Sequence, residues 1–394
     1  MQDELSVRQS AIRLRLAGES IESICRTLKR SRVWFHKWWR RYLESGPEGL
    51  YDLTRGNHLV VNRTPPHIER AVISIRRRLA ARAIPQTRYS QIGAAQIRAE
   101  LETLGYTPLP SLRTIRRIIT RAGLSCPPLK LSPRIARNDY PGPQARDSNH
   151  VHQVDVVGPR YLKGDSTRYY FLVCKDVFDQ SVYMEFVDSR KMDGIMSFLV
   201  HAWQHLGLPE KAQFDNGREF CGFGYTSRFL SQVIRLCVRL GVEPVFIPKG
   251  KPQRNGSVEN FNGWLQPLLL SRPFRRPCDV RRELRRLVTT VNEQHVYVKL
   301  GGRTAAQYRR SKQLRKLTAD FTVEGKLAVT VGKVTFIRLV SVQGTVRVLG
   351  QSFKVGKRLK YQYVKVTIYT KYQKLKIYYK GKLIKEFSYP LPRR

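Results

Sequence analysis

The first fifty residues alternate apolar and polar positions at the spacing of short amphipathic helices. Within 5–45, apolar residues recur every three or four positions, for example at Trp34 and Trp38. Ser20 and Ser31 each precede such a run, where a side-chain hydroxyl can cap a helix. The pattern therefore predicts a domain over 1–50 with three helices and a tight turn between the second and third, which is the helix-turn-helix layout.

The helical spacing returns after a turn-rich stretch and predicts a second helix-turn-helix unit over 64–124. Ser111 is the expected N-cap of its last helix. The three helices are expected over 67–81, 89–104 and 112–122. A proline-rich polar stretch over 125–149 follows and is expected to be a linker.

Short apolar runs replace the helical spacing from residue 150 onward. Three strands are predicted at 151–157, 169–175 and 181–187. Helices are then predicted over about 191–206 and 226–240 and from Asn255, alternating with short strands that end near 215 and span 242–247. Three consecutive strands followed by alternating helices and strands predict an α/β domain with a mixed sheet over 150–315.

The last part of the chain, 321–390, consists of short alternating stretches separated by glycines, of which 326–331 is the first. This pattern predicts a small β-barrel. The expected fold class is therefore multidomain, with two all-α helix-turn-helix units, an α/β core with a mixed sheet and a C-terminal barrel.

The charge of the chain points to a polyanionic partner. Its 394 residues carry 72 Lys and Arg against 30 Asp and Glu, a formal net charge of +42, and 321–394 alone holds 17 basic against two acidic residues. An excess of this size, spread over the whole length, is typical of nucleic-acid binding. Ribosomal and chromatin-packing proteins share it, so the charge does not distinguish them from an enzyme that acts on DNA.

The composition argues against several other classes of protein. Hydrophobic residues make up 41 % of the chain, too many for a disordered protein, and no stretch approaches the ~20 apolar residues of a membrane span. The six cysteines include no CxxC pair, which argues against a zinc knuckle and favours a reducing compartment. We expect an intracellular protein.

Basic side chains on the polar faces of two predicted helices are candidate DNA contacts. The third helix of each helix-turn-helix unit is the one expected to enter a major groove. An ordinary three-helix bundle would show the same apolar pattern, and the net charge favours DNA binding over it. The candidates are Arg32, His36, Lys37, Arg40 and Arg41 in the first unit and Arg113, Arg116 and Arg117 in the second.

Three acidic residues of the predicted core are candidates for chemistry. Asp155 lies within an apolar strand, where an ionised carboxylate is costly unless it is paired or binds a metal. Asp215 follows a strand, and Glu259 lies on a predicted helix opposite its apolar stripe. Each has a structural explanation on its own: a buried ion pair, a turn and a solvated helix residue. Their joint order of strand, strand tip and helix is harder to explain in that way.

The sequences HQVDVVGP, FDNGREF and NGSVEN around these acids resemble the three acidic motifs of integrase-core insertion-sequence transposases, which belong to the retroviral-integrase superfamily and have a ribonuclease-H-like core. The resemblance implies that Asp155, Asp215 and Glu259 form a metal-binding catalytic triad. The 43 residues between Asp215 and Glu259 exceed the usual spacing, which implies an insertion near 221–228. Glu219 and Glu243 are alternative third acids.

Carboxylate ligands suit Mg²⁺ or Mn²⁺ and disfavour zinc, and two such ions about 3.5–4 Å apart can catalyse displacement at phosphorus. The resemblance implies a DNA transposase that binds the terminal inverted repeats of its element. Such an enzyme hydrolyses a strand at the element ends and joins the exposed 3′-hydroxyl to target DNA. Lys249, Lys251 and Arg254, before the Glu259 helix, are candidates for holding the phosphates.

Joining two ends requires at least two protomers, so the expected partners are double-stranded DNA, from element ends and target, and further copies of the chain. The expected location is the prokaryotic cytoplasm, at the nucleoid. Two other functions share parts of the pattern. A catalytically inactive integrase-fold regulator would keep the DNA-binding units without metal-dependent nicking. A ribonuclease acting on RNA–DNA hybrids would not need two helix-turn-helix units.

Overall fold

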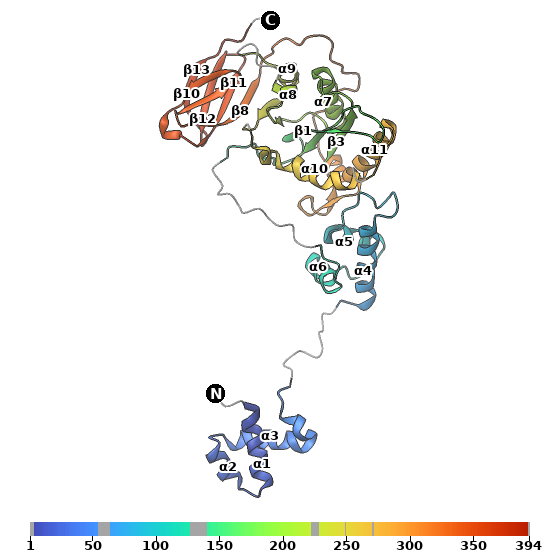
Figure 1. Cartoon of the computed structure of the whole chain (residues 1–394), viewed down its shortest axis with the longest axis vertical. Coiled ribbons are helices and arrows are strands. Elements are labelled where there is room, and N and C mark those ends of the chain that lie inside the picture. Colours follow the sequence, from blue (N-terminus) through green and yellow to red (C-terminus); the bar gives the residue numbers. More distant parts are fainter. Residues whose placement is uncertain are drawn as a thin grey trace. The chain divides into compact units, whose positions relative to one another are not determined.

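The computed structural model describes residues 4–53, 64–126, 140–221, 228–248, 250–269 and 272–392. The chain forms two compact units, Met1–Thr64 and Pro65–Arg394, and each is described by itself (Figure 1). Within the described ranges, every helix is too short or too polar to cross a bilayer.

The first unit contains the three predicted helices and a short 3₁₀ turn. They are α1 Glu4–Leu16, α2 Ile21–Thr27 and α3 Arg32–Ser45, followed by the turn Gly46–Leu50. The Ser20 hydroxyl accepts a hydrogen bond from the Ser23 amide at 3.2 Å, and the Ser31 hydroxyl accepts one from the Trp34 amide at 3.1 Å. Both predicted caps are therefore confirmed. Phe35 and Trp38 are the α3 side chains buried in the core.

The second unit begins with α4 Pro66–Ala81, α5 Ala94–Thr103 and α6 Leu112–Arg121, the last capped by Ser111 as predicted. The prediction that the middle helix starts at residue 89 is wrong by five residues. Tyr89 is 1 % exposed, and its hydroxyl donates a hydrogen bond to the Glu283 carboxylate at 3.0 Å. Because the segment before α5 packs Tyr89 against a distant helix, it forms turns instead of extending α5.

A nine-stranded sheet organises the rest of the second unit. Its order is β13-β12-β11-β8-β5-β4-β1-β2-β3. The strands of the predicted core are β1 Val151–Arg160, β2 Tyr169–Asp176, β3 Val182–Val187, β4 Lys211–Phe214 and β5 Glu243–Phe246. The first three are antiparallel, whereas β4 pairs in parallel with β1 and β5 with β4. The predicted α/β core with a mixed sheet is thus confirmed.

Helices cover both faces of this core (Figure 1). One face packs against α7 Met192–Leu206 and α9 Gln232–Arg239, and the other against α10 Gly256–Leu269 and α11 Pro277–Glu293. The remaining short elements of this region are α8 Arg218–Cys221, the pair β6 Val296–Tyr297 and β7 Arg303–Thr304, and α12 Ala305–Arg310. The fully buried Trp203 of α7 is the largest side chain of the first face.

The C-terminal strands continue the core sheet. Parallel pairing of Val245 with Thr335 and of Phe246 with Phe336 joins β8 to β5. The antiparallel strands that follow are β8 Lys333–Leu339, β11 Tyr363–Tyr369, β12 Lys374–Tyr379 and β13 Lys382–Ser388, with a hairpin of β9 Thr345–Val348 and β10 Gln351–Lys354. The predicted β-rich segment is present. The pairings of the described strands form a meander and a hairpin, so closure into a barrel stays a prediction.

The strand predicted over 326–331 does not form. The Leu327 amide donates a hydrogen bond to the Gln232 side chain at 2.7 Å, and its carbonyl accepts one from Arg235 at 2.8 Å. Both backbone groups of this apolar residue are therefore bonded to side chains of α9, and 326–331 lies against that helix as an irregular segment.

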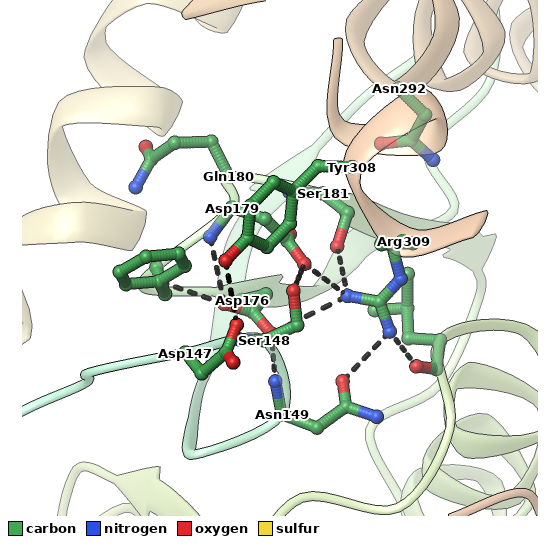
Figure 2. A network of polar contacts seen from close by, with 12 residues as sticks. Asp147, Ser148, Asn149, Asp176, Asp179, Gln180, Ser181, Asn292, Tyr308 and Arg309 are labelled. Carbon is green, nitrogen blue, oxygen red and sulfur yellow. Dashed lines mark hydrogen bonds and ion pairs between the residues drawn. The ribbon is translucent and has the colours of Figure 1, made fainter. Parts of the chain in front are cut away.

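Arg309 of α12 ties distant segments of the core together (Figure 2). Its guanidinium donates to the Asp179 carboxylate at 2.5 Å, to the Ser181 hydroxyl at 3.0 Å and to the Asn149 side chain at 2.7 Å. It also lies 3.4 Å from the Asp176 carboxylate, and both aspartates are fully buried. One arginine therefore supplies a counter-charge that two buried acids share, and it holds the entry to β1, the β2–β3 turn and α12 in one network.

Candidate active site

Two aspartates lie close together where the parallel pairing of the central strands β1 and β4 ends. The parallel register of β1 and β4 places Gln153 opposite Gln213. Each aspartate follows two residues later: Asp155 in the middle of β1, and Asp215 directly after the end of β4, a strand tip of the kind where sites gather in α/β sheets. Their charges interact, because ionised Asp215 contributes to raising the pKa of Asp155.

The start of α10 is held against these strands by the two glutamines. Gln153 accepts hydrogen bonds from the amides of Ser257 and Val258, both at 3.0 Å. Gln213 donates to the Asn255 side chain at 3.1 Å. The first turn of α10, which carries Glu259, is therefore fixed to β1 and β4 two residues before each aspartate.

The three acids form an electrostatically coupled group. Burial, and after it the like charges of Asp215 and Glu219, raise the pKa of Asp155. Burial and then the Asp155 charge raise the pKa of Glu259. Asp215 has a raised pKa as well, because of burial and the Glu219 charge. In the part of the chain that the structure describes, none of the three predicted acids forms an ion pair with a basic side chain.

A second pair of acids in the same domain lies against a basic side chain, unlike the predicted triad. Asp176 and Asp179 are more deeply buried than the predicted triad, yet Arg309 lies against both. Burial alone would raise the pKa of Asp176, but a hydrogen bond with His152 and the Arg309 charge outweigh it and lower the pKa. These two acids share a counter-charge within the fold, whereas the acids of the predicted triad have none among the described residues.

Asn262, one turn after Glu259 on α10, was not singled out from the sequence and belongs to the site. It donates a hydrogen bond to the Asp155 carboxylate at 2.7 Å. Its own side-chain oxygen is buried and has no hydrogen-bond partner. An amide at this position, on the same helix side as Glu259, is the sequence signal that could have identified it.

The donor set fits a hard divalent cation. Among the described residues no three His, Cys, Asp or Glu side chains already converge as ligands of one ion. The group offers only oxygen donors, its carboxylates repel one another without a neutralising cation, and the Asn262 oxygen is unpaired. These properties suit Mg²⁺ or Mn²⁺ and not a thiolate- or imidazole-bound metal.

The alternative acids are placed differently. Glu219, on α8, lies close enough to raise the pKa values of Asp155 and Asp215, and it forms a long contact with Arg190 at 3.8 Å. Glu243 begins β5, at the opposite end of the parallel strands, and accepts a hydrogen bond from Thr335 at 2.6 Å. The structure thus brings Glu219 to the acids and keeps Glu243 away. The predicted insertion falls mostly on 222–227, outside the described residues.

The basic residues expected near the acids also differ in their surroundings. Arg254 lies 4.2 Å from the centre of the Tyr140 ring and 5.4 Å from that of Tyr363, so aromatic rings pack against its guanidinium. Lys251 is exposed to solvent. Lys249 lies outside the described residues.

The candidate DNA contacts of the two predicted helix-turn-helix units are mostly at the surface. Arg41 is the exception, because its guanidinium donates to the Tyr51 carbonyl at 2.8 Å and lies 4.6 Å from the Trp38 ring centre. It therefore helps to hold the turn after α3 against that helix. The exposed candidates are Arg32, His36, Lys37 and Arg40 on α3 and Arg113, Arg116 and Arg117 on α6.

Comparison with known families supports the N-terminal assignment. Residues 3–51 match the model of a homeodomain-like domain, which covers α1–α3 and the following turn. The first unit is therefore a helix-turn-helix domain of a DNA-binding kind.

Several solved structures are similar to parts of the chain. One is the simian T-cell lymphotropic virus intasome in complex with a PP2A regulatory subunit, with 22 % identity over 59 % of this chain and 81 % of the other and a TM-score of 0.36. The HTLV-2 integrase catalytic core domain with magnesium is 24 % identical over 42 % of this chain and 99 % of its own, with a TM-score of 0.33. The BIV integrase core is 18 % identical over 41 % and 95 %, with a TM-score of 0.31.

Proposed function

We propose that this chain is a DNA transposase of the integrase-core kind. It would cut a DNA strand at the ends of a mobile element and join the resulting 3′-hydroxyl to target DNA. The observation that carries the proposal is the group formed by Asp155, Asp215 and Glu259. These acids come from the middle of β1, the residue after β4 and the first turn of α10, are partly buried, and have no basic partner among the described residues.

In this proposal the three carboxylates hold two Mg²⁺ or Mn²⁺ ions. When bound, such ions activate the attacking oxygen and stabilise the leaving oxygen of an in-line displacement at phosphorus. The protein supplies the framework: Asn262 orients the Asp155 carboxylate, and Gln153 holds the α10 turn that carries Glu259. Water is the first nucleophile and the exposed 3′-hydroxyl the second, so no covalent protein–DNA bond is formed.

The N-terminal units would select the DNA. The exposed basic side chains of α3 and α6 would contact the terminal repeats of the element, while Lys251 would contact phosphates near the acids. Since two ends must be joined to one target, the working complex would contain at least two copies of the chain on double-stranded DNA. A prokaryotic nucleoid is the setting in which such an element would move.

The test uses the full chain, labelled duplexes carrying the ends of the encoding element, and Mg²⁺ or Mn²⁺. Asp155→Asn, Asp215→Asn and Glu259→Gln should each reduce strand cleavage and joining by a factor of roughly 10³ or more, because each removes a ligand of the reaction centre. Binding to the ends, measured by electrophoretic mobility shift, should stay within twofold of the wild type. Asp193→Asn, which changes an exposed acid of α7, is the matched control and should keep full activity.

Two results would overturn the proposal. Cleavage retained by all three variants would show that the acids are not the reaction centre. A wild-type chain that binds the ends tightly but yields no metal-dependent product would instead favour the integrase-fold regulator.

A further inference from the structure

We propose that Arg338, on the C-terminal strand β8, is a positioning residue for the candidate active site and fixes the loop that carries Asp215. This inference rests on the proposed function and adds to it. The C-terminal strands would then complete the site as well as bind DNA.

The contacts of Arg338 converge on that loop. One terminal nitrogen donates to the side-chain oxygen of Asn216 at 2.7 Å, and the other donates to the Ile247 carbonyl at 3.1 Å. The Asn216 side-chain nitrogen donates to the same Ile247 carbonyl. Asn216 is thereby held between the ends of β5 and β8, directly after Asp215. The Asp215 carboxylate closes the turn by accepting the Gly217 amide at 2.9 Å.

The remaining donors of Arg338 are also used inside the protein. Its Nε donates to the Arg347 carbonyl at 3.2 Å, and Nη1 donates to the Ile337 carbonyl at 2.9 Å as well. The four oxygen acceptors described around the guanidinium are neutral, and burial lowers its pKa to about 10, so it stays charged at neutral pH. The planar guanidinium of an arginine can donate hydrogen bonds to all of these acceptors at once, whereas a lysine ammonium cannot. Because most of its donors are used inside the protein, this guanidinium is poorly suited to binding a DNA phosphate.

A second contact links the C-terminal strands to the start of α10, the helix that carries Glu259. Arg254 lies just before α10 and packs against Tyr363 of β11 as well as against Tyr140. Tyr363, Ile337 and Val245 belong to one small hydrophobic cluster at the junction of β5, β8 and β11. Two of the three segments that carry candidate acids, the Asp215 loop and the α10 start, therefore contact the C-terminal strands β8 and β11.

The experiment compares Arg338→Met and Arg338→Lys in the full chain, with Arg347→Met as the control that removes an exposed arginine from the neighbouring strand. A misplaced catalytic group can cost about 100-fold in rate, so we expect both Arg338 variants to lower the turnover of strand joining by roughly 10–100-fold. The half-saturating Mg²⁺ concentration should rise, while the Kd for DNA ends stays within twofold. Arg347→Met should keep the turnover of the wild type.

Two further measurements separate positioning from a general structural role. If Arg338 acts through Asn216, the double variant Arg338→Met/Asn216→Ala should be no slower than the slower single variant. Hydrogen exchange of the 215–221 amides should accelerate in Arg338→Met and not in Arg347→Met, while the exchange of β2 amides stays unchanged.

Two results would overturn the role proposed for Arg338. Rescue by Arg338→Lys, with DNA binding weakened and its salt slope reduced by about one in Arg338→Met, would assign Arg338 to phosphate contact and overturn the proposal. Unchanged exchange of the loop amides would also overturn it. A wild-type chain without any strand joining would refute the proposed function, whereas the exchange comparison would still decide the role of Arg338.

Discussion

Two pairs of aspartates in the core differ in the charges that surround them. Asp176 and Asp179 are buried beside one guanidinium, and they share its positive charge. Asp155 and Asp215 are partly buried beside other acids, and burial together with their neighbours raises both pKa values. Burial is costly for an ionised group without a counter-charge, so Asp155 and Asp215 reduce the stability of the metal-free protein.

This difference predicts a stability effect for Asp155→Asn. A carboxyl group whose pKa is raised by folding destabilises the folded state above that raised pKa, and the penalty disappears below the pKa of the unfolded chain, near 4. Without divalent cations, Asp155→Asn should therefore raise the melting temperature at pH 7 by on the order of 2 °C. Acidification toward pH 4 should remove the gain. Calorimetry with Asp193→Asn as the control checks this, and a lower melting temperature for Asp155→Asn would contradict it.

The site was partly predictable from single residues. Asp155 stood out as an acid within an apolar strand, Asp215 as an acid that follows a strand, and Glu259 as a helix acid opposite the apolar stripe, and the structure couples their charges. Their assignment as a catalytic triad stays a prediction. Gln153 and Asn262 were not singled out, because an amide carries no signal of its partner until the sheet register and the start of α10 are known.

Among the helices and strands, the well-predicted features depend on local chemistry. The hydroxyl caps at Ser20, Ser31 and Ser111 form as expected, since a cap involves residues within one turn. The errors at the start of α5 and over 326–331 arise where long-range contacts replace local ones. Tyr89 is bonded to Glu283, and Leu327 to α9. Such partners cannot be read from neighbouring residues.

The attachment of α10 predicts the effect of Gln153→Leu. The glutamine oxygen is buried and accepts two amides of the first turn, so its loss leaves buried donors without a partner. We expect the free energy of unfolding to fall by about 1–3 kcal/mol and strand cleavage to fall with it. Gln294→Leu, the same change at an exposed position, should shift stability by less than ~0.5 kcal/mol. Urea unfolding measures both, and equal stability of the two variants would argue against a fixed α10 start.

For the whole molecule, the sheet joins parts that the sequence suggests are separate. The C-terminal segment was predicted as a barrel of its own, but β8 pairs with β5, and one hydrophobic core contains residues from both sides of that junction. Among these are Phe246 and Phe336, whose rings stack 4.9 Å apart. The segment is therefore part of the folded unit that carries the acids.

Two truncations follow from this arrangement. Removing residues 1–64 should leave 65–394 folded, with a single cooperative unfolding transition. Removing 321–394 should abolish that transition, because it exposes the β5 edge and side chains such as Phe246, each worth about 1.5–3 kcal/mol of burial. Circular dichroism and limited proteolysis distinguish the two truncated chains. A cooperatively folded 1–320 fragment would contradict the prediction.

The network around Arg309 also has a consequence for synthesis on the ribosome. Asp179 emerges 130 residues before its arginine, which corresponds to roughly 7–26 s of translation at ordinary bacterial and eukaryotic rates. During that interval β2 and β3 have left the exit tunnel while their buried acids still lack this cation. The nascent domain can close only after α12 has emerged, so chaperone protection would matter most within this window.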